Sequence, residues 1–269
     1  MFFKNEACNK TTEPVNFAHL VEMTQYFACD FRQNAAPQYI ATYDITSCVV
    51  LIIKNMQENK QCAHFGMAHI NLSNVYSMPQ TLVNLRQFID AFTAIGGNLA
   101  TASIQMIGGL INDPNQVRGR IKLGFRELNN KLAIKEPKGY ELNGGIEEGK
   151  KGNGEMLTVM CDQDGTYIRK MFFVDSTIKD IEFNGAKAKE FLTPENANKY
   201  LQADSKLHNR YKDKTQGFFT EINALRSLKL QAGSSEYETR LQDIIFKHGI
   251  LEQSTYTPVN IKQDCLKIK

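Results

Sequence analysis

The chain of 269 residues is long enough for one large domain, or for a domain with a smaller appendage. Apolar residues make up 42% of it, which allows a sizeable core and argues against a disordered chain. The formal net charge is only +3, and Lys and Arg are spread along the chain, so the composition does not indicate a nucleic-acid-binding protein.

The cysteines and the N-terminus bear on the cellular setting. The six cysteines are widely separated and form no C-x-x-C motif, which favours reduced thiols in a cytosolic protein. The first ten residues lack the charged-then-apolar order of a signal peptide. The longest apolar run, Val49–Ile53, is too short to cross a bilayer. We therefore expect a soluble protein that does not act on membranes, with export by a route that needs no cleavable signal still open.

In the N-terminal half, apolar spacing and turn residues define the expected elements. They are a helix over 15–29, a turn over 34–38, strands over 39–43 and 47–54, a turn over 55–61 and a strand over 62–70. The polar turn joins the two apolar runs that flank it, so those two strands are expected to form a hairpin.

In the rest of the chain, helices and strands alternate before a helical end. The expected elements are a helix over 80–95, a strand over 98–110, a helix over 115–130, strands over 131–135, 156–161 and 166–174, and helices over 193–212, 217–231 and 235–248. Pro79 precedes the first of these helices and Gly96-Gly97 follows it, as is usual at helix ends. The charged, glycine-rich segment 137–154 predicts an exposed loop.

These elements predict an α+β fold, with a mixed β-sheet sandwich core flanked by helices and a C-terminal helical extension. The expected domain covers residues 1–190, and residues 191–269 are expected to form a helical cap or a partner-binding extension.

Cys48 is the cysteine whose setting suits a nucleophile. Polar Thr46 and Ser47 precede it and the apolar run Val49–Ile53 follows, so it is expected at the start of a buried strand. A thiol reacts as the thiolate and needs a base nearby. At a strand start, the Cys48 N–H can point into the same space as the sulfur and donate to an oxyanion. A buried structural thiol is the alternative, because free cysteine is among the most buried residue types.

The base is expected on the next strand, which contains His64 and His69. Residues an odd number apart on a continuous strand point to opposite faces, so only one histidine should face Cys48 unless a bulge, for which Gly66 is suited, intervenes. A metal site formed by Cys62, His64 and His69, with the first two on one face, is a second interpretation. No further ligand cluster and no cofactor fingerprint is visible, so we expect a site without metal or cofactor.

Three short motifs occur in order along the chain. They are Thr42 six residues before Cys48, the segment Gly66-Met67-Ala68-His69, and a helix followed by a strand that ends in Gly108-Gly109. In these motifs, and in a final hairpin containing Arg169, residues 39–175 resemble the CheD family of chemotaxis glutamine deamidases and the related catalytic domains of cytotoxic necrotizing factor toxins.

The resemblance implies a cysteine-dependent protein glutamine deamidase, with Cys48 as nucleophile, His69 as base and Thr42 fixing the imidazole. It implies no cofactor, a partner protein whose glutamine is the substrate, and a location in the bacterial cytoplasm or, for an effector or toxin, in a host cell. Thr42 can also be read as an ordinary strand threonine. The Asn-, Lys- and Gln-rich composition and the extra helices favour the effector.

Two other functions stay open at this stage. The spacing from Cys48 to His69 is longer than in the family, and Ile45-Thr46-Ser47 replaces its glycine-rich approach to the cysteine. Both differences bear on the substrate class, and the long spacing suggests a catalytically inactive binding module on the same fold. A thiol protease or acyltransferase would use the same pair, and transglutamination would share the first chemical steps with deamidation.

Overall fold

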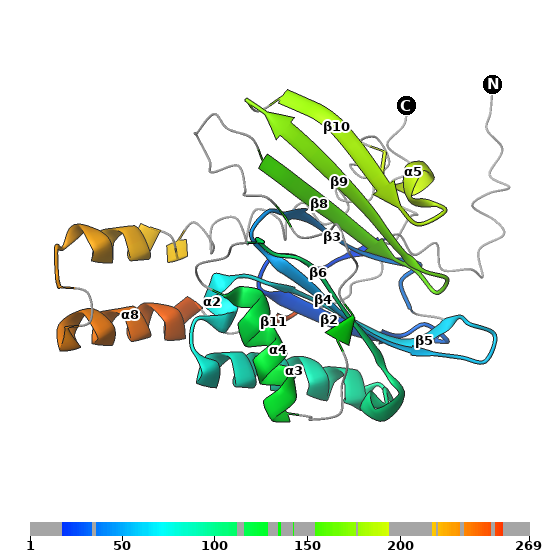
Figure 1. The fold of residues 1–269 in the computed structure, drawn as a ribbon. Helices are drawn as coiled ribbons and strands as arrows, with labels where there is room; N and C mark the ends of the chain where they lie inside the picture. Colours follow the sequence, from blue (N-terminus) through cyan, green and yellow to red (C-terminus); the bar gives the residue numbers. More distant parts are fainter. Residues whose placement is uncertain are drawn as a thin grey trace, which may run out of the picture.

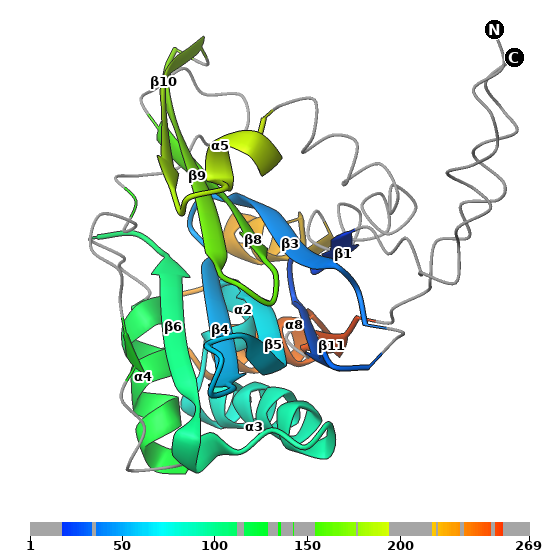
Figure 2. The ribbon, with the colours of Figure 1, turned by 90° about the vertical axis from the view of Figure 1, so that its right-hand side faces the viewer.

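The computed structural model describes residues 18–33, 36–111, 116–128, 134–135, 142, 154–175, 177–193, 217–218, 220–231, 234–248 and 251–254. Over these residues two β-sheets lie face to face, and helices cover the outer side of one of them (Figures 1 and 2). The expected α+β fold, with a sandwich core, flanking helices and a C-terminal helical extension, is confirmed.

Sheet 1 has five strands and sheet 2 has six. Sheet 1 consists, in spatial order, of β1 (Ala18–Leu20), β3 (Tyr39–Ile45), β8 (Gly154–Cys161), β9 (Thr166–Val174) and β10 (Thr177–Asn184). Sheet 2 consists of β11 (Glu252–Gln253), β2 (Gln25–Asp30), β5 (Cys62–Ile70), β4 (Val49–Met56), β6 (Ser103–Gly108) and β7 (Ile134–Lys135). Short parallel pairs at the sheet edges accompany an antiparallel centre.

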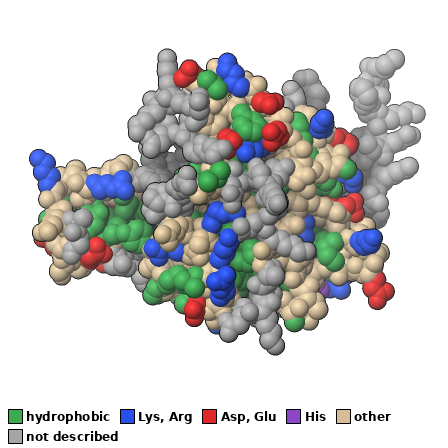
Figure 3. Space-filling model, in the orientation of Figure 1, with side chains coloured by type: hydrophobic (Ala, Val, Ile, Leu, Met, Phe, Trp, Pro, Cys, Tyr) green, Lys and Arg blue, Asp and Glu red, His purple; other side chains and the backbone are tan. Residues whose placement is uncertain are grey.

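The helices differ in how closely they join this body. The helical elements are α2 (Leu72–Val75), α3 (Met78–Ala94), a 3₁₀ turn (Leu99–Thr101), α4 (Val117–Leu128), α5 (Ala188–Phe191) and α8 (Ser235–His248). Helices α3 and α4 cover the outer face of sheet 2, and α5 lies on the outer face of sheet 1 (Figure 2). Helix α8 and the helical residues 220–227 project from the body as a pair, with hydrophobic side chains between them (Figures 1 and 3).

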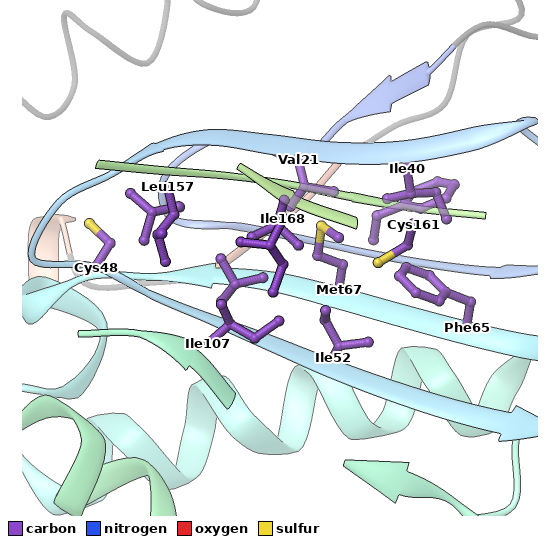
Figure 4. Close-up of a cluster of buried hydrophobic side chains, with 14 of the residues drawn as sticks. Val21, Ile40, Cys48, Ile52, Phe65, Met67, Ile107, Leu157, Cys161 and Ile168 are labelled. Atoms are coloured by element: carbon purple, nitrogen blue, oxygen red, sulfur yellow. The ribbon is translucent and has the colours of Figure 1, made fainter. Parts of the chain in front are cut away.

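The main core lies between the two sheets (Figure 4). Strand β4 is central to it, because both of its faces are covered: Val50 and Ile52 point toward sheet 1, whereas Val49, Leu51 and Ile53 point toward the helices. All five are fully buried. Burial on both faces explains why this strand is a continuous apolar run and not an alternating one.

The helix predicted over residues 15–29 is wrong, because this segment contains strands β1 and β2. The apolar residues of β2 serve both faces of sheet 2: Phe27 points into the core between the sheets, and Tyr26 points toward the helices. A short strand that is apolar on both faces resembles a helix in its spacing. Pairing with β5, a partner about 40 residues away, decides the conformation.

Most of the other elements are confirmed. The β4–β5 hairpin, α3, α4, the β8–β9 hairpin and α8 lie within a few residues of their predicted bounds. The strand predicted over 98–110 instead begins with a 3₁₀ turn, and β6 covers only Ser103–Gly108. The edge strands β10 and β11 were not predicted. The predicted loop over 137–154 and the predicted helix over 193–212 lie almost wholly outside the described residues.

No helix among the described residues has both the length and the apolar character needed to cross a membrane.

Candidate active site

Strand β3 contains a bulge between Thr42 and Ile45. Thr42 pairs with Val159 of β8, but Ile45, three residues later, pairs with Leu157 only two residues earlier. The extra residue on β3 is accommodated at Asp44, whose φ of 58° is in the left-handed region. As a result Thr42 and Ile45 both point inward and are fully buried, although three residues separate them.

Thr42 meets His69 across the gap between the sheets. On β5, Phe65 and Met67 point into the core between the sheets, and His69 continues the same alternation. Thr42 Oγ1 lies 2.9 Å from His69 Nδ1, while His69 Nε2 is buried without a hydrogen-bond partner among the described residues. If Nδ1–H donates to Thr42 Oγ1, Nε2 carries the free lone pair.

Cys48 stands at the entry to β4, and two glycines hold its backbone. Gly108 and Gly109 both have left-handed φ values, of 84° and 81°. The Gly109 N–H donates to the Cys48 carbonyl at 2.8 Å, and a Cβ at Gly108 would come within 2.9 Å of that same oxygen. The Gly-Gly pair that ends β6 is therefore required for the close approach of β6 to Cys48.

Cys48 and His69 lie on the same face of sheet 2. His69 is directly opposite Val50 in the β4–β5 pair, and Cys48 shares the inward face of Val50 two residues earlier. Such diagonal neighbours are about 7–8 Å apart, within reach of long side chains. In the structure, however, the Cys48 thiol lies against Met23, with 3.8 Å between the two sulfur atoms, and it makes no hydrogen bond to His69.

Burial makes this pair neutral at rest. It raises the pKa of the Cys48 thiol to about 12, and the negative charge of Asp44 adds to that effect. It also lowers the pKa of His69 to about 3. A thiol and a neutral imidazole, and not a thiolate and an imidazolium, are therefore the resting forms.

His64 takes no part in this arrangement. Its side chain lies on the other face of sheet 2, beside Gly96, and is hydrogen-bonded to Arg32 at 2.7 Å. The expectation that Cys62 and His64 share a face is wrong, because β5 has a register shift between them and Cys62 points into the core. Within the described residues no group of three or more His, Cys, Asp or Glu is arranged to hold a metal ion.

Gly66 has a different role from the one expected, because the bulge in β5 does not occur there. A Cβ at Gly66 would come within 3.0 Å of the Phe88 ring, so this glycine makes room for helix α3. The Gly66-Met67-Ala68-His69 motif thus combines a packing position on the helix side with an inward-pointing histidine.

Two side chains near these strands were not predicted as part of a site. Met23, which covers Cys48, lies in the β1–β2 turn, inside the segment wrongly predicted as a helix. Lys54 lies on β4 at an inward position, in register with Cys48, Val50 and Ile52, and is only 7% exposed. For Lys54 the sequence did contain a signal, because a lysine stands where the alternation of the strand predicts an inward-pointing apolar residue.

In comparisons with protein-family models and with curated proteins, nothing matched the chain.

Proposed function

We propose that the protein is a cysteine-dependent glutamine deamidase, in which Cys48 attacks the side-chain amide of a glutamine on a partner protein. In this proposal His69 is the general base and Thr42 orients its imidazole. The resemblance of residues 39–175 to the CheD family suggested these roles, and the geometry of the site supports them independently.

The hydrogen bond between Thr42 and His69 is the observation on which the proposal rests. It joins two strands of different sheets, and it occupies the imidazole nitrogen that a general base does not use. The other nitrogen has no hydrogen-bond partner in the described part of the chain and lies on the face of sheet 2 that Cys48 shares. A purely structural buried histidine is expected to satisfy both of its nitrogens.

The chemistry requires one proton shuttle and two acyl-transfer steps. His69 Nε2 takes the thiol proton as the sulfur attacks the amide carbon, and the imidazolium then gives that proton to the leaving ammonia. Water, deprotonated by the same nitrogen, cleaves the thioester to leave glutamate and the free thiol. The Cys48 N–H makes no backbone hydrogen bond within the described residues, so it can donate to the oxyanion.

The resting site is closed, and the proposal therefore includes an opening step. Cys48 is 5% exposed and Met23 lies against its thiol, whereas Met23 itself is only partly buried, in the turn between β1 and β2. Displacement of the Met23 side chain would expose the thiol without moving a strand. Because thiol and imidazole are both neutral, proton transfer accompanies attack and does not precede it.

Thiol labelling tests the activated pair, with Cys62 as an internal reference. Burial raises the pKa of Cys62 to about 12 as well, so its thiol, like that of Cys48, is neutral at rest. We expect iodoacetamide, itself a primary amide, to label Cys48 faster than Cys62 near neutral pH. His69→Ala should reduce the Cys48 rate by about 100-fold, the lower end of general-base contributions.

Two variants separate the parts of the proposal. Met23→Ala should speed labelling of Cys48, and the increase should disappear in the Met23→Ala/His69→Ala double variant. Equal, slow labelling of Cys48 and Cys62 in all of these proteins would refute the activated pair. It would support the alternative of an inactive binding module, with which the closed site is also consistent.

The type of reaction needs its own readout. With a library of glutamine-containing peptides, a deamidase releases ammonia and raises the peptide mass by the Gln-to-Glu difference, without creating a new N-terminus. A new N-terminus would instead identify a thiol protease, and neither product should form with Cys48→Ala.

A further inference from the structure

Lys54 is a buried cation to which the proposed deamidase chemistry assigns no role. It lies on β4 at the end of the strand opposite to Cys48 and is 7% exposed. Its Nζ donates to the Thr166 hydroxyl at 2.8 Å and to the Gly165 carbonyl at 3.2 Å, and it lies 5.4 Å from the centre of the Phe65 ring. These partners are all neutral. They make polar contacts with the Lys54 ammonium group, but none of them supplies a negative charge to balance it.

The two carboxylates of the β8–β9 turn contact groups other than Lys54. Asp164 pairs with Lys187 at 3.0 Å, and both carboxylate oxygens of Asp162 accept from the Tyr167 hydroxyl at 3.0 Å. The thiols of Cys62 and Cys161 are neutral at ordinary pH, because burial raises the pKa of each. Among the described residues, Lys54 forms no ion pair. An unpaired buried charge is costly, unless a ligand supplies the opposite charge.

A pocket of about 430 Å³ opens beside this ammonium, where β4 and β6 of sheet 2 face β9 and β10 of sheet 1. Its lining combines neutral polar side chains, above all Ser103, Gln105 and Thr166, with the apolar residues Ile107 and Ile168. Figure 4 shows these two isoleucines close together in the core between the sheets. The volume lies in the range of small-molecule sites. Asp164 also lines the pocket, but its carboxylate is paired with Lys187. One unpaired cation, neutral donors and an apolar surface together suit a short organic anion.

We propose that this pocket binds a small monocarboxylate, with its carboxylate on Lys54 and its carbon chain over Ile107 and Ile168. A carboxylate needs one counter-charge, and the pocket has one. A phosphate dianion would place a second negative charge beside the Asp164 carboxylate, with no other unpaired described cation lining the pocket. The proposal concerns a site distinct from Cys48 and does not depend on the deamidase assignment.

An NMR titration with butyrate tests the proposal, with butyramide as the uncharged ligand of the same shape. Ionic strength is held constant with sodium chloride. We expect butyrate, but not butyramide, to shift the backbone amide signals of Gly165 and Thr166 in a saturable way. Lys54→Met should weaken butyrate binding by about 10- to 100-fold, the range for loss of a charge-assisted hydrogen bond.

Matched variants keep the test decisive. Lys179→Met removes the same charge from an exposed position on β10 and should bind butyrate like the wild type. If Lys54→Met does not fold, Ser103→Tyr fills the pocket while keeping Lys54, and it should abolish the shifts. No saturable shift in the wild type, equal binding by Ser103→Tyr, or tighter binding of inorganic phosphate than of butyrate would overturn the proposal.

Discussion

Two histidines buried in the neutral form should make the fold sensitive to mild acid. His69 and His19 are each 2% exposed, and burial lowers the pKa of each from 6.5 to about 3. The unfolded chain exposes both side chains, which then take up protons near pH 6.5. Since the unfolded state binds more protons over this range, the free energy of unfolding falls as the pH drops from 6.5 toward 3.

The expected effect is large relative to the stability of a domain. Each proton difference contributes about 1.4 kcal/mol per pH unit. At pH 5 each histidine therefore lowers the free energy of unfolding by about 2 kcal/mol, and the two together by about 4 kcal/mol. Typical domain stabilities are only about 5–15 kcal/mol.

Urea unfolding at pH 7, 6 and 5 measures this slope directly. His69→Gln, which cannot titrate, should reduce the loss of stability between pH 6 and pH 5 by about half, and Thr42→Val should lower stability at every pH without changing the slope. Equal slopes for the wild type and His69→Gln would show that His69 is not buried in the neutral form. The resting state described for the candidate site would then be wrong.

Three further perturbations follow from the same geometry. Thr42→Val should cost about 1–3 kcal/mol in urea unfolding, because it leaves a buried imidazole nitrogen unsatisfied; an unchanged midpoint would mean that the Thr42–imidazole bond is not formed. Stability should fall as the pH rises above 9, because burial raises the pKa of both Cys48 and Cys62 from 9.0 to about 12, and the unfolded thiols ionise first. Replacing both with Ala should reduce the slope of that alkaline loss of stability, as followed by circular dichroism, and the buried thiols of Cys29 and Cys161 should account for part of the remainder. Gly108→Ala should destabilise the protein by about 2 kcal/mol or more in thermal unfolding. The φ of Gly108 is left-handed, and the new Cβ would come within 2.9 Å of the Cys48 carbonyl oxygen. Gly119→Ala is the control and should not destabilise the protein, because a Cβ at this helix position meets no close neighbour.

The sequence was most informative where one local signal decided the structure. The apolar runs around Cys48 and His69, separated by a polar turn, specified the β4–β5 hairpin, and Asp-Gly in the next hairpin specified the β8–β9 turn. Pro79 and Gly96-Gly97 bounded helix α3 correctly to within two residues. In each case the pattern, the turn residues and the neighbours in sequence agreed.

Features that depend on distant partners could not be predicted from the sequence. The conformation of residues 25–30 is set by pairing with β5, and β11 is defined by pairing with residues more than 200 positions earlier. Ile45 points to the same side as Thr42 only because of the bulge at Asp44, and the spacing of the strand residues does not reveal that bulge. The closure of the site by Met23 likewise depends on the true course of β1 and β2.

Strand β4 connects the two proposed sites and also separates them. Cys48 and Lys54 are six residues apart, which corresponds to about 20 Å along an extended strand. Between them, Val50 and Ile52 are fully buried in the core, so no ligand as small as butyrate can contact both ends. Lys54→Met should therefore leave the labelling rate of Cys48 unchanged, and His69→Ala should leave butyrate binding unchanged. The two sites have no direct contact. If Lys54→Met changed Cys48 labelling, or His69→Ala changed butyrate binding, the effect would have to be transmitted through the packed core between the sheets.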